Sequence, residues 1–386
     1  MILSILFWMT SALFAYFVLK RLFLEHFYIN YVGKFVFITG CDSGFGRLLA
    51  VRLLKMGVNV FAGCYTEVGC ENLLKQGRRL GKGQIFTVQI DITNDESVMN
   101  ARIKIEKILD AQNAHLHGVV NNAGVFTVFG PDDWCTTEEY LASLNVNTLG
   151  AIRVCHNFLP LVKKCKGRVV TMGSTTGRLH GLYVGPYVTA KFAVEAYMDC
   201  LRLEMRPFGV SVHILEPGAF KTDLLNEKAH YDRVNKAWEK LPSVTKNEYG
   251  EQFKENFKVA WQTGVNLVAN PNLQWVCRQL CSRTIWYAAG WDAIFCFIPL
   301  SLLPTWIQDT VLHFMYSMQP GPPLHPSSLQ NKKEKMSLIG RTSSWFENIG
   351  HISILSIAFV AVYIKSLLPY VTARTIPNRN NTSSTS

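Results

Sequence analysis

The chain has 386 residues, of which 48% are hydrophobic and 17% are charged, and its formal net charge is +11. This length can bury a large core, and the composition excludes a disordered or fibrous protein. The basic residues form no stripe interleaved with aromatic side chains, which argues against nucleic acid as a partner. The ten cysteines show no CxxC or other paired spacing, so we expect reduced cysteines and no metal site.

An uncharged apolar segment opens the sequence. Residues 1–19 contain no charged side chain, and Lys20 and Arg21 end the run. About 20 apolar residues span the hydrocarbon core of a bilayer. A cleaved signal peptide would instead start with basic residues and end with small ones. We therefore predict a retained transmembrane anchor over residues 1–24.

Apolar sequence returns near the C-terminus, where residues 348–364 carry no formal charge. We predict a Pro-rich and basic linker over 319–345, a candidate second transmembrane segment over 346–371 and a polar tail over 372–386. A helix that lies on the membrane surface or covers the core is the alternative for the second segment. Residues 293–306 contain Pro299 and Pro304, and we expect them to dip into the membrane or to form a substrate mouth.

Basic residues set the expected orientation in the membrane. Lys20 and Arg21 follow the first segment, and a basic cluster over 332–341 precedes the second. Cytosolic flanks are rich in Lys and Arg, so we expect the folded domain on the cytosolic side, with the endoplasmic reticulum as the expected membrane. Glycosylation sequons at Asn380 and Asn381 would then face the lumen. The sequence leaves open whether the chain forms a homodimer.

Strand-like and helix-like patterns alternate after residue 33. Short apolar runs rich in β-branched and aromatic residues predict strands, and a period of 3.6 residues predicts helices between them. The predicted strands are 34–39, 58–62, 84–90, 117–120, 168–172 and 210–215. The predicted helices are 47–56, 67–80, 95–109 and 137–164. Repeated strand–helix units with continuous apolar strands indicate an α/β fold, a doubly wound (Rossmann) parallel sheet within residues 34–315.

A glycine cluster lies between the first predicted strand and the first predicted helix, in the run Thr39-Gly-Cys-Asp-Ser-Gly-Phe-Gly46. Gly40 permits a tight turn. Gly44 and Gly46 are expected to let a pyrophosphate approach the helix N-terminus, where N–H groups and the helix dipole favour anions. The strand before and the helix after the cluster favour a nucleotide site over a simple turn.

The spacing TGxxxGxG resembles the short-chain dehydrogenase/reductase family, and further matches follow in order. Asp91 ends the third predicted strand, where the family's aspartate contacts adenine, and Asn121-Asn-Ala-Gly124 ends the fourth. Pro217-Gly218 with Thr222 resembles the PGxxxT that holds the nicotinamide amide. The resemblance covers residues 34–315. It implies cofactor contacts from Gly40, Ser43, Gly44, Gly46, Asp91, Asn122, Ala123, Gly124, Tyr187, Lys191, Pro217, Gly218 and Thr222.

The choice between NAD and NADP depends on the end of the second strand. An acidic residue there accepts the ribose hydroxyls of NAD, whereas a nearby basic residue binds the 2′-phosphate of NADP. Cys64, Tyr65 and Thr66 stand at this position, and Ser43 is uncharged. Neither determinant is found in the sequence. Without a cation for the phosphate we favour NAD(H), with NADP(H) as the alternative.

Tyr187 and Lys191 form a Tyr-x-x-x-Lys pair on one helix face. A nearby ammonium stabilises a phenolate, so we expect the tyrosine pKa to fall from about 10 by about one to three units. The family resemblance implies that Tyr187 is the acid/base group of an alcohol dehydrogenase and that Ser174 hydrogen-bonds the substrate oxygen. It also implies that Asn147 holds a proton-relay water near the lysine. All four catalytic positions are filled, which favours a competent active site over a degenerate one.

Residues 38–46, 61–67 and 216–222 are similar to the membrane-bound branch of retinol and hydroxysteroid dehydrogenases. This resemblance implies a lipophilic alcohol, retinol or a hydroxysteroid, interconverted with its carbonyl. Mitochondrial D-3-hydroxybutyrate dehydrogenase shares a sequence like that of residues 38–46 and is one alternative. The uncharged N-terminal segment, however, does not resemble a targeting sequence for the mitochondrial matrix. A non-catalytic scaffold that binds NAD or lipid is the other alternative.

A tryptophan-rich segment follows the predicted Rossmann core. We expect residues 225–315 to build the substrate mouth. The six tryptophans of this segment are Trp238, Trp261, Trp275, Trp286, Trp291 and Trp306. For any single one of them, packing or interfacial anchoring is favoured over substrate contact.

Overall fold

The computed structural model describes residues 31–80, 82–127, 130–269, 286–290, 292–317 and 327. At the centre of the described residues is a sheet of seven strands in the order β3-β2-β1-β4-β5-β6-β7, and all neighbours are parallel. The strands are β1 (Phe35–Ile38), β2 (Asn59–Cys64), β3 (Ile85–Gln89), β4 (Leu116–Asn121), β5 (Arg168–Met172), β6 (Ser211–Pro217) and β7 (Trp286–Ala289). The predicted parallel sheet is confirmed, and β7 adds an edge strand that was not predicted.

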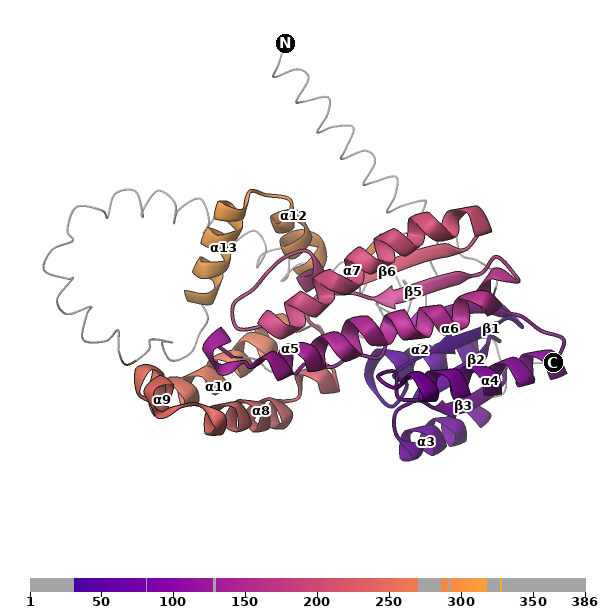
Figure 1. Ribbon diagram of the computed structural model, residues 1–386, viewed down its shortest axis with the longest axis horizontal. Helices are drawn as coiled ribbons and strands as arrows, with labels where there is room; N and C mark the ends of the chain where they lie inside the picture. The colour runs from indigo at the N-terminus through magenta and orange to yellow at the C-terminus, as the bar shows by residue number, and fades with distance from the viewer. Residues whose placement is uncertain are drawn as a thin grey trace, which may run out of the picture.

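Helices cover both faces of the sheet. They are α2 (Gly44–Lys55), α3 (Glu67–Arg78), α4 (Asp95–Ala111), α6 (Ala151–Lys163) and α7 (Gly185–Met205). Side chains alternate across a strand, so Phe35 and Phe37 of β1 pack with α4, α6 and α7, whereas Val36 and Ile38 pack with α2 and α3. Burial on both faces is why the strand is continuously apolar. Figure 1 shows α4, α6 and α7 running across the strands.

The predicted helix 137–164 is interrupted. It consists of α5 (Thr137–Leu144), a π-helical turn (Asn145–Gly150) and α6. The Thr148 hydroxyl donates to the carbonyl of Ala190 in α7 at 2.8 Å and fixes the turn against that helix. Such wider turns are frequent at functional sites. Hydrophobic periodicity does not reveal the turn because the bond that fixes it joins Thr148 to Ala190, 42 residues further along the chain.

A third core joins the Rossmann sheet to a helical layer. This layer consists of α8 (Glu227–Lys240), α9 (Ser243–Tyr249) and α10 (Glu251–Val268). Trp134 is 2% exposed, and its ring meets four aromatic rings edge-on, with centroids 5.2 to 5.8 Å away. These rings belong to Trp238, Tyr249, Phe253 and Phe257. Aromatic burial of this kind holds the layer in place. Two further helices, α12 (Ile298–Ser301) and α13 (Thr305–Ser317), follow β7.

None of the helices in the described ranges is long and apolar enough to cross a bilayer. The predicted anchor over 1–24, the second segment over 346–371 and the tail over 372–386 lie outside those ranges. The predicted linker over 319–345 also lies outside them, apart from Ser327.

Candidate active site

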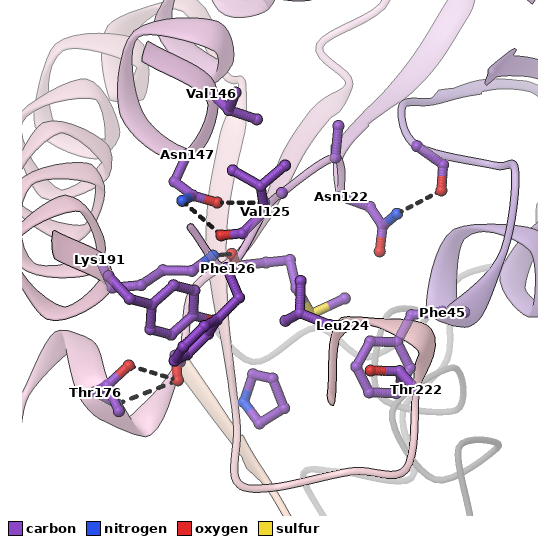
Figure 2. A pocket seen from close by; sticks show the side chains of 18 of the residues that line it. Phe45, Asn122, Val125, Phe126, Val146, Asn147, Thr176, Lys191, Thr222 and Leu224 are labelled. Atoms are coloured by element: carbon purple, nitrogen blue, oxygen red, sulfur yellow. Dashed lines mark hydrogen bonds between the residues drawn. The ribbon is translucent and has the colours of Figure 1, made fainter. Parts of the chain in front are cut away.

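A cavity of about 890 Å³ lies at the carboxyl ends of the central strands. The strand order reverses between β1 and β4, and open parallel sheets bind their ligands at such a switch point. Every predicted site residue except Gly46 lines this cavity. The lining residues are Gly40, Ser43, Gly44, Asp91, Asn122, Ala123, Gly124, Asn147, Ser174, Tyr187, Lys191, Pro217, Gly218 and Thr222. Figure 2 shows Asn147 and Lys191 on one side of the pocket and Thr222 on another.

The three glycines of the first loop have different roles. Gly40 has a φ of +69°, and a Cβ added there would lie 2.7 Å from the Cα of Ala123. A Cβ at Gly46 would lie 2.3 Å from the carbonyl oxygen of Gly40, so this glycine lets α2 pack against its own loop. A Cβ at Gly46 would face backbone and not the cavity, and the predicted pyrophosphate contact of Gly46 stays a prediction.

Gly44 opens the N-terminus of α2 to the cavity. Its φ is +55°, and a Cβ added there would meet no atom nearer than 3.9 Å. Ser43 is the N-cap residue, but its side chain makes no capping hydrogen bond. The first N–H groups of α2 therefore lie beside open space, which fits the pyrophosphate of a dinucleotide.

Thr39 and Asn122 tie the loops after β1 and β4 together. The Thr39 hydroxyl accepts hydrogen bonds from the main-chain N–H groups of Asn122 and Ala123, both at 3.1 Å. The Asn122 side chain donates to the carbonyls of Thr39 at 2.9 Å and Gly40 at 3.0 Å. The sequence motif contained Thr39, but spacing alone did not identify it as a site residue.

Asp91 follows β3 and faces the cavity. Its Oδ1 accepts hydrogen bonds from the Thr93 main-chain N–H at 2.8 Å and from the Thr93 hydroxyl at 2.7 Å. Its main-chain N–H donates to the Ser97 hydroxyl oxygen at 2.9 Å. These bonds hold the carboxyl group in one orientation. Its contact with adenine stays a prediction.

Asn147 lies in the π-helical turn and is buried. Its Oδ1 accepts from the N–H of Val125 at 3.0 Å, and its Nδ2 donates to the carbonyl of Val125 at 2.9 Å. Nδ2 also donates to the Ser143 hydroxyl at 3.2 Å. The side chain therefore clamps the loop after β4 to the helix (Figure 2). Its role in a proton relay stays a prediction.

Ser174, Tyr187 and Lys191 lie together at one end of the cavity. Ser174 follows β5, and Tyr187 and Lys191 lie on α7. The Lys191 Nζ donates to the carbonyl of Met172, the last residue of β5, at 2.8 Å and lies 5.5 Å from the ring centroid of Tyr187. The Ser174 oxygen accepts from the main-chain N–H and the hydroxyl of Thr176 at 3.2 and 2.9 Å. The predicted catalytic residues thus meet at one place.

Burial dominates the electrostatics of this group. It raises the pKa of Tyr187 to about 12, and a hydrogen bond with the Ser174 side chain only partly opposes this shift. It also lowers the pKa of Lys191 to about 8, against the attraction of Glu195. The predicted fall of the tyrosine pKa is therefore not found. In a low-dielectric site the desolvation of a phenolate outweighs a neighbouring amine that is itself easily neutralised.

A buried ionic cluster lies behind Lys191 and was not predicted. Glu195 is one helical turn further along α7 and 7% exposed. Its carboxylate lies 3.7 Å from the Nε of Arg178, which donates to Glu216 at 2.6 Å. Burial and the nearby Glu216 raise the pKa of Glu195, while Arg178 lowers it. No short sequence motif predicts this cluster, because Arg178, Glu195 and Glu216 come from three separate segments of the chain.

Asp292 supports the loop after β6. Its Oδ2 accepts from the N–H of Ala219 at 2.7 Å. A Cβ at Gly218 would lie 2.1 Å from the same oxygen, so only glycine admits the carboxylate there. Thr222 follows on this loop. A Cβ added at Gly44, in the loop after β1, would lie 3.9 Å from the Cβ of Thr222. Sequence reasoning missed Asp292, which belongs to no motif.

The catalytic end of the cavity is lined mainly by apolar side chains. These are Phe126, Val184, Leu224, Leu225, Phe297 and Leu312. The rings of Phe126 and Tyr187 are 4.7 Å apart between centroids. Of the segment 225–315, only Leu225, Phe297 and Leu312 are among the described residues that line the cavity. Trp238 and Trp261 are buried among other aromatic rings, so for these two tryptophans packing is the role observed.

Replacement of the buried lysine gives a test of the pKa shift. The folded-state pKa of Lys191 is about 8, against an ordinary value of 10.5, so its burial destabilises the fold below pH 8, and this penalty fades as the pH rises towards 10.5. We expect Lys191→Met to raise the free energy of unfolding at pH 7 by about 2 kcal/mol, after allowance for the lost hydrogen bond.

Urea unfolding of both proteins at pH 7 and pH 10 measures this gain, which should shrink at the higher pH. Lys107→Met, at an exposed position of α4, is the control and should give no gain. An equal gain at both pH values would contradict the shift.

Proteins of similar sequence belong to the same enzyme family that the site geometry indicates. The family described as short chain dehydrogenase matches residues 34–232. The 3beta-hydroxysteroid dehydrogenase dhs-16 of Caenorhabditis elegans is 54% identical over 364 residues and covers 92% of each chain. Retinol dehydrogenase 7 of Rattus norvegicus is 40% identical over 77% of this chain and 93% of its own. The human 17-beta-hydroxysteroid dehydrogenase type 6 is 39% identical over 72% of this chain and 87% of its own.

Solved structures agree with the fold. A short-chain dehydrogenase/reductase from Burkholderia phymatum, in complex with NAD, has a TM-score of 0.58 at 20% identity and covers 77% of this chain and 99% of its own. One from Burkholderia cenocepacia, in complex with NADP, has a TM-score of 0.54 at 19% identity over 75% and 99%. The chain therefore belongs to the short-chain dehydrogenase family of NAD(P)-dependent oxidoreductases, in the branch of retinol and hydroxysteroid dehydrogenases.

Proposed function

We propose that this protein interconverts a hydroxysteroid and its ketosteroid with NAD(H). The observation that carries the proposal is that Ser174 and Tyr187 face a cavity that is also lined by the apolar side chains of Phe126, Val184, Leu224, Leu225, Phe297 and Leu312. A steroid nucleus with one hydroxyl group matches such a lining, because the hydrocarbon is buried and the hydroxyl finds polar partners. The identity of 54% to a relative named as a 3beta-hydroxysteroid dehydrogenase supports a 3-hydroxyl group. Retinol is the second candidate, supported by a relative named as a retinol dehydrogenase at 40% identity.

The geometry suggests how the side chains divide the work in the direction of oxidation. Ser174 accepts two hydrogen bonds from Thr176 and its hydroxyl also bonds Tyr187, so the substrate oxygen would be held between these two hydroxyl groups. Tyr187 takes the proton of the substrate hydroxyl, and the Lys191 ammonium stabilises the phenolate form. NAD⁺, which the loops after β1, β4 and β6 would hold, would supply the acceptor for the hydride of the carbinol carbon and a positive charge beside the phenol. In the reverse direction Tyr187 returns the proton to the carbonyl oxygen.

Replacement of the tyrosine tests this division. We expect Tyr187→Phe to lower kcat by about a thousandfold, because general acid–base catalysis contributes on this scale. Binding of NADH, followed by the change in its fluorescence, should stay close to that of the wild type. Phe208→Leu, at an exposed aromatic position, serves as the control for handling and folding. Undiminished turnover by the Tyr187 variant would refute the mechanism.

A substrate panel tests the proposed function itself. The detergent-solubilised protein is mixed with NAD⁺ and one of several alcohols: a 3β-hydroxysteroid, a 3α-hydroxysteroid, a 17β-hydroxysteroid, all-trans-retinol and D-3-hydroxybutyrate. NADH formation is recorded, and each assay is repeated with NADP⁺. We expect the highest kcat/KM with the 3β-hydroxysteroid. Turnover of hydroxybutyrate alone would overturn the proposal, and failure with every alcohol and both cofactors would favour a non-catalytic protein.

We also propose that the protein is held in a membrane, with the endoplasmic reticulum as the compartment and the catalytic domain on the cytosolic side. The uncharged residues 1–19 and 348–364 support this proposal. An exposed apolar turn between α12 and α13 adds support, since Leu302 is 78% and Trp306 is 70% exposed. The neighbouring Phe297 and Leu312 line the cavity. A lipophilic substrate would thus pass from the lipid to Tyr187 without crossing water.

Extraction of membranes at alkaline pH tests the two anchors. We expect the full chain and a form lacking residues 1–24 to stay with the membrane pellet, and a form lacking both 1–24 and 346–371 to be released. Release of the form lacking only 1–24 would exclude the second span. A loss of mass from the full chain on glycosidase treatment, absent from an Asn380→Gln/Asn381→Gln variant, would place the tail in the lumen.

A further inference from the structure

We infer that Asp42 selects NAD(H) over NADP(H), because its carboxylate occupies the turn after β2 where the 2′-phosphate of NADP would have to bind. The inference rests on the proposed use of a nicotinamide dinucleotide, and it identifies an acidic determinant that the second strand itself lacks. Asp42 belongs to the glycine loop after β1, two residues before α2 begins at Gly44. It lines the cavity together with Tyr65 and Thr66, which follow β2.

The carboxylate of Asp42 is bonded to the main chain of the neighbouring turn. Its Oδ2 accepts from the N–H of Tyr65 at 2.7 Å, and its Oδ1 accepts from the N–H of Thr66 at 3.0 Å. Oδ1 also accepts from the Thr66 hydroxyl at 2.7 Å. A Cβ at Gly69 would lie 2.4 Å from Oδ1, so the first turn of α3 leaves space for this carboxylate. The loop and the turn therefore fit each other.

These bonds place an anion where the chain would otherwise bind one. Thr66 is the N-cap of α3 and precedes Glu67 in its first turn. Main-chain N–H groups at a helix N-terminus attract anions such as phosphate. Here the N–H groups of Tyr65 and Thr66 are already used by Asp42. A 2′-phosphate would lose these donors and would also meet a fixed negative charge, whereas ribose hydroxyls can donate to a carboxylate.

The cations near this end do not compensate. Among the described residues that line the cavity, Lys191 is the only lysine or arginine, and it lies at the catalytic end. Arg47 of α2 lies beside this loop: its NH1 donates to the main-chain carbonyl of Asp42 at 3.4 Å, and its Nε and NH2 donate to the Gln76 side chain at 3.2 and 3.0 Å. Arg47 does not line the cavity. Asp42 is therefore the charged side chain of the cavity lining that is bonded to the turn after β2.

Equilibrium binding of NADH and NADPH tests the inference without relying on turnover. Dissociation constants are measured by the fluorescence of the reduced nicotinamide for the wild type, Asp42→Asn and the control Glu71→Gln. Glu71 is an exposed residue of α3 paired with Lys75, so its replacement removes the same charge away from the cavity. Thermal unfolding of each variant checks that the turn has folded. A second variant, Tyr65→Arg, adds a cation at this end and keeps the Asp42 bond to the main-chain N–H.

We expect the wild type to bind NADH at least about tenfold more tightly than NADPH, a difference of about 1.4 kcal/mol. Asp42→Asn should reduce this preference by about tenfold or more, mainly through tighter NADPH binding, and Tyr65→Arg should shift it in the same direction with Asp42 intact. Glu71→Gln should leave the preference unchanged. An unchanged preference in both Asp42→Asn and Tyr65→Arg, or a wild-type preference for NADPH, overturns the assignment to Asp42. If the wild type binds neither cofactor, the proposed function fails and this inference fails with it.

Discussion

The hydrogen bonds between the loops after β1 and β4 are the constraint on which the site depends. Thr39 and Asn122 hold the two loops at the point where the sheet reverses its strand order. The contact is so close that Gly40 and Gly46 cannot carry a side chain. Because the loops are fixed, the N-terminus of α2 opens to the cavity at Gly44.

At the catalytic end the proposed proton transfer uses charged forms of Tyr187 and Lys191, whereas burial disfavours charged forms. A buried ammonium is unfavourable, and Lys191 is accommodated by the Met172 carbonyl and by the charge of Glu195 one turn away. The same burial raises the pKa of the Tyr187 phenol. The protein alone therefore keeps the tyrosine protonated. To act as the proposed base, the tyrosine would need a further positive charge nearby, and a bound nicotinamide would supply one.

The cavity has a polar and an apolar half, and different parts of the chain build them. The polar half comes from the loops after the strands, where main-chain groups and Asp42, Asp91 and Asn122 gather. The apolar half borders the helical layer, whose aromatic rings pack around Trp134 in the segment after β4. The substrate wall therefore rests on packing that lies outside the nucleotide-binding motifs.

The sequence by itself determined six of the seven described strands, the glycine loop and the four positions predicted to be catalytic, because buried parallel strands and tight turns restrict residue type locally. Only the tertiary structure decided the π-helical turn at Asn147, the edge strand β7, and the roles of Gly46, Asp292 and Glu195. Each of these depends on atoms brought together from distant segments, as when Asp42 meets Tyr65 and Thr66. The acidic group missing from the end of β2 is supplied by another loop, and no reading of β2 alone could find it. Burial likewise decided the direction of the tyrosine pKa shift, since the dielectric surroundings of a side chain are a property of the packed molecule.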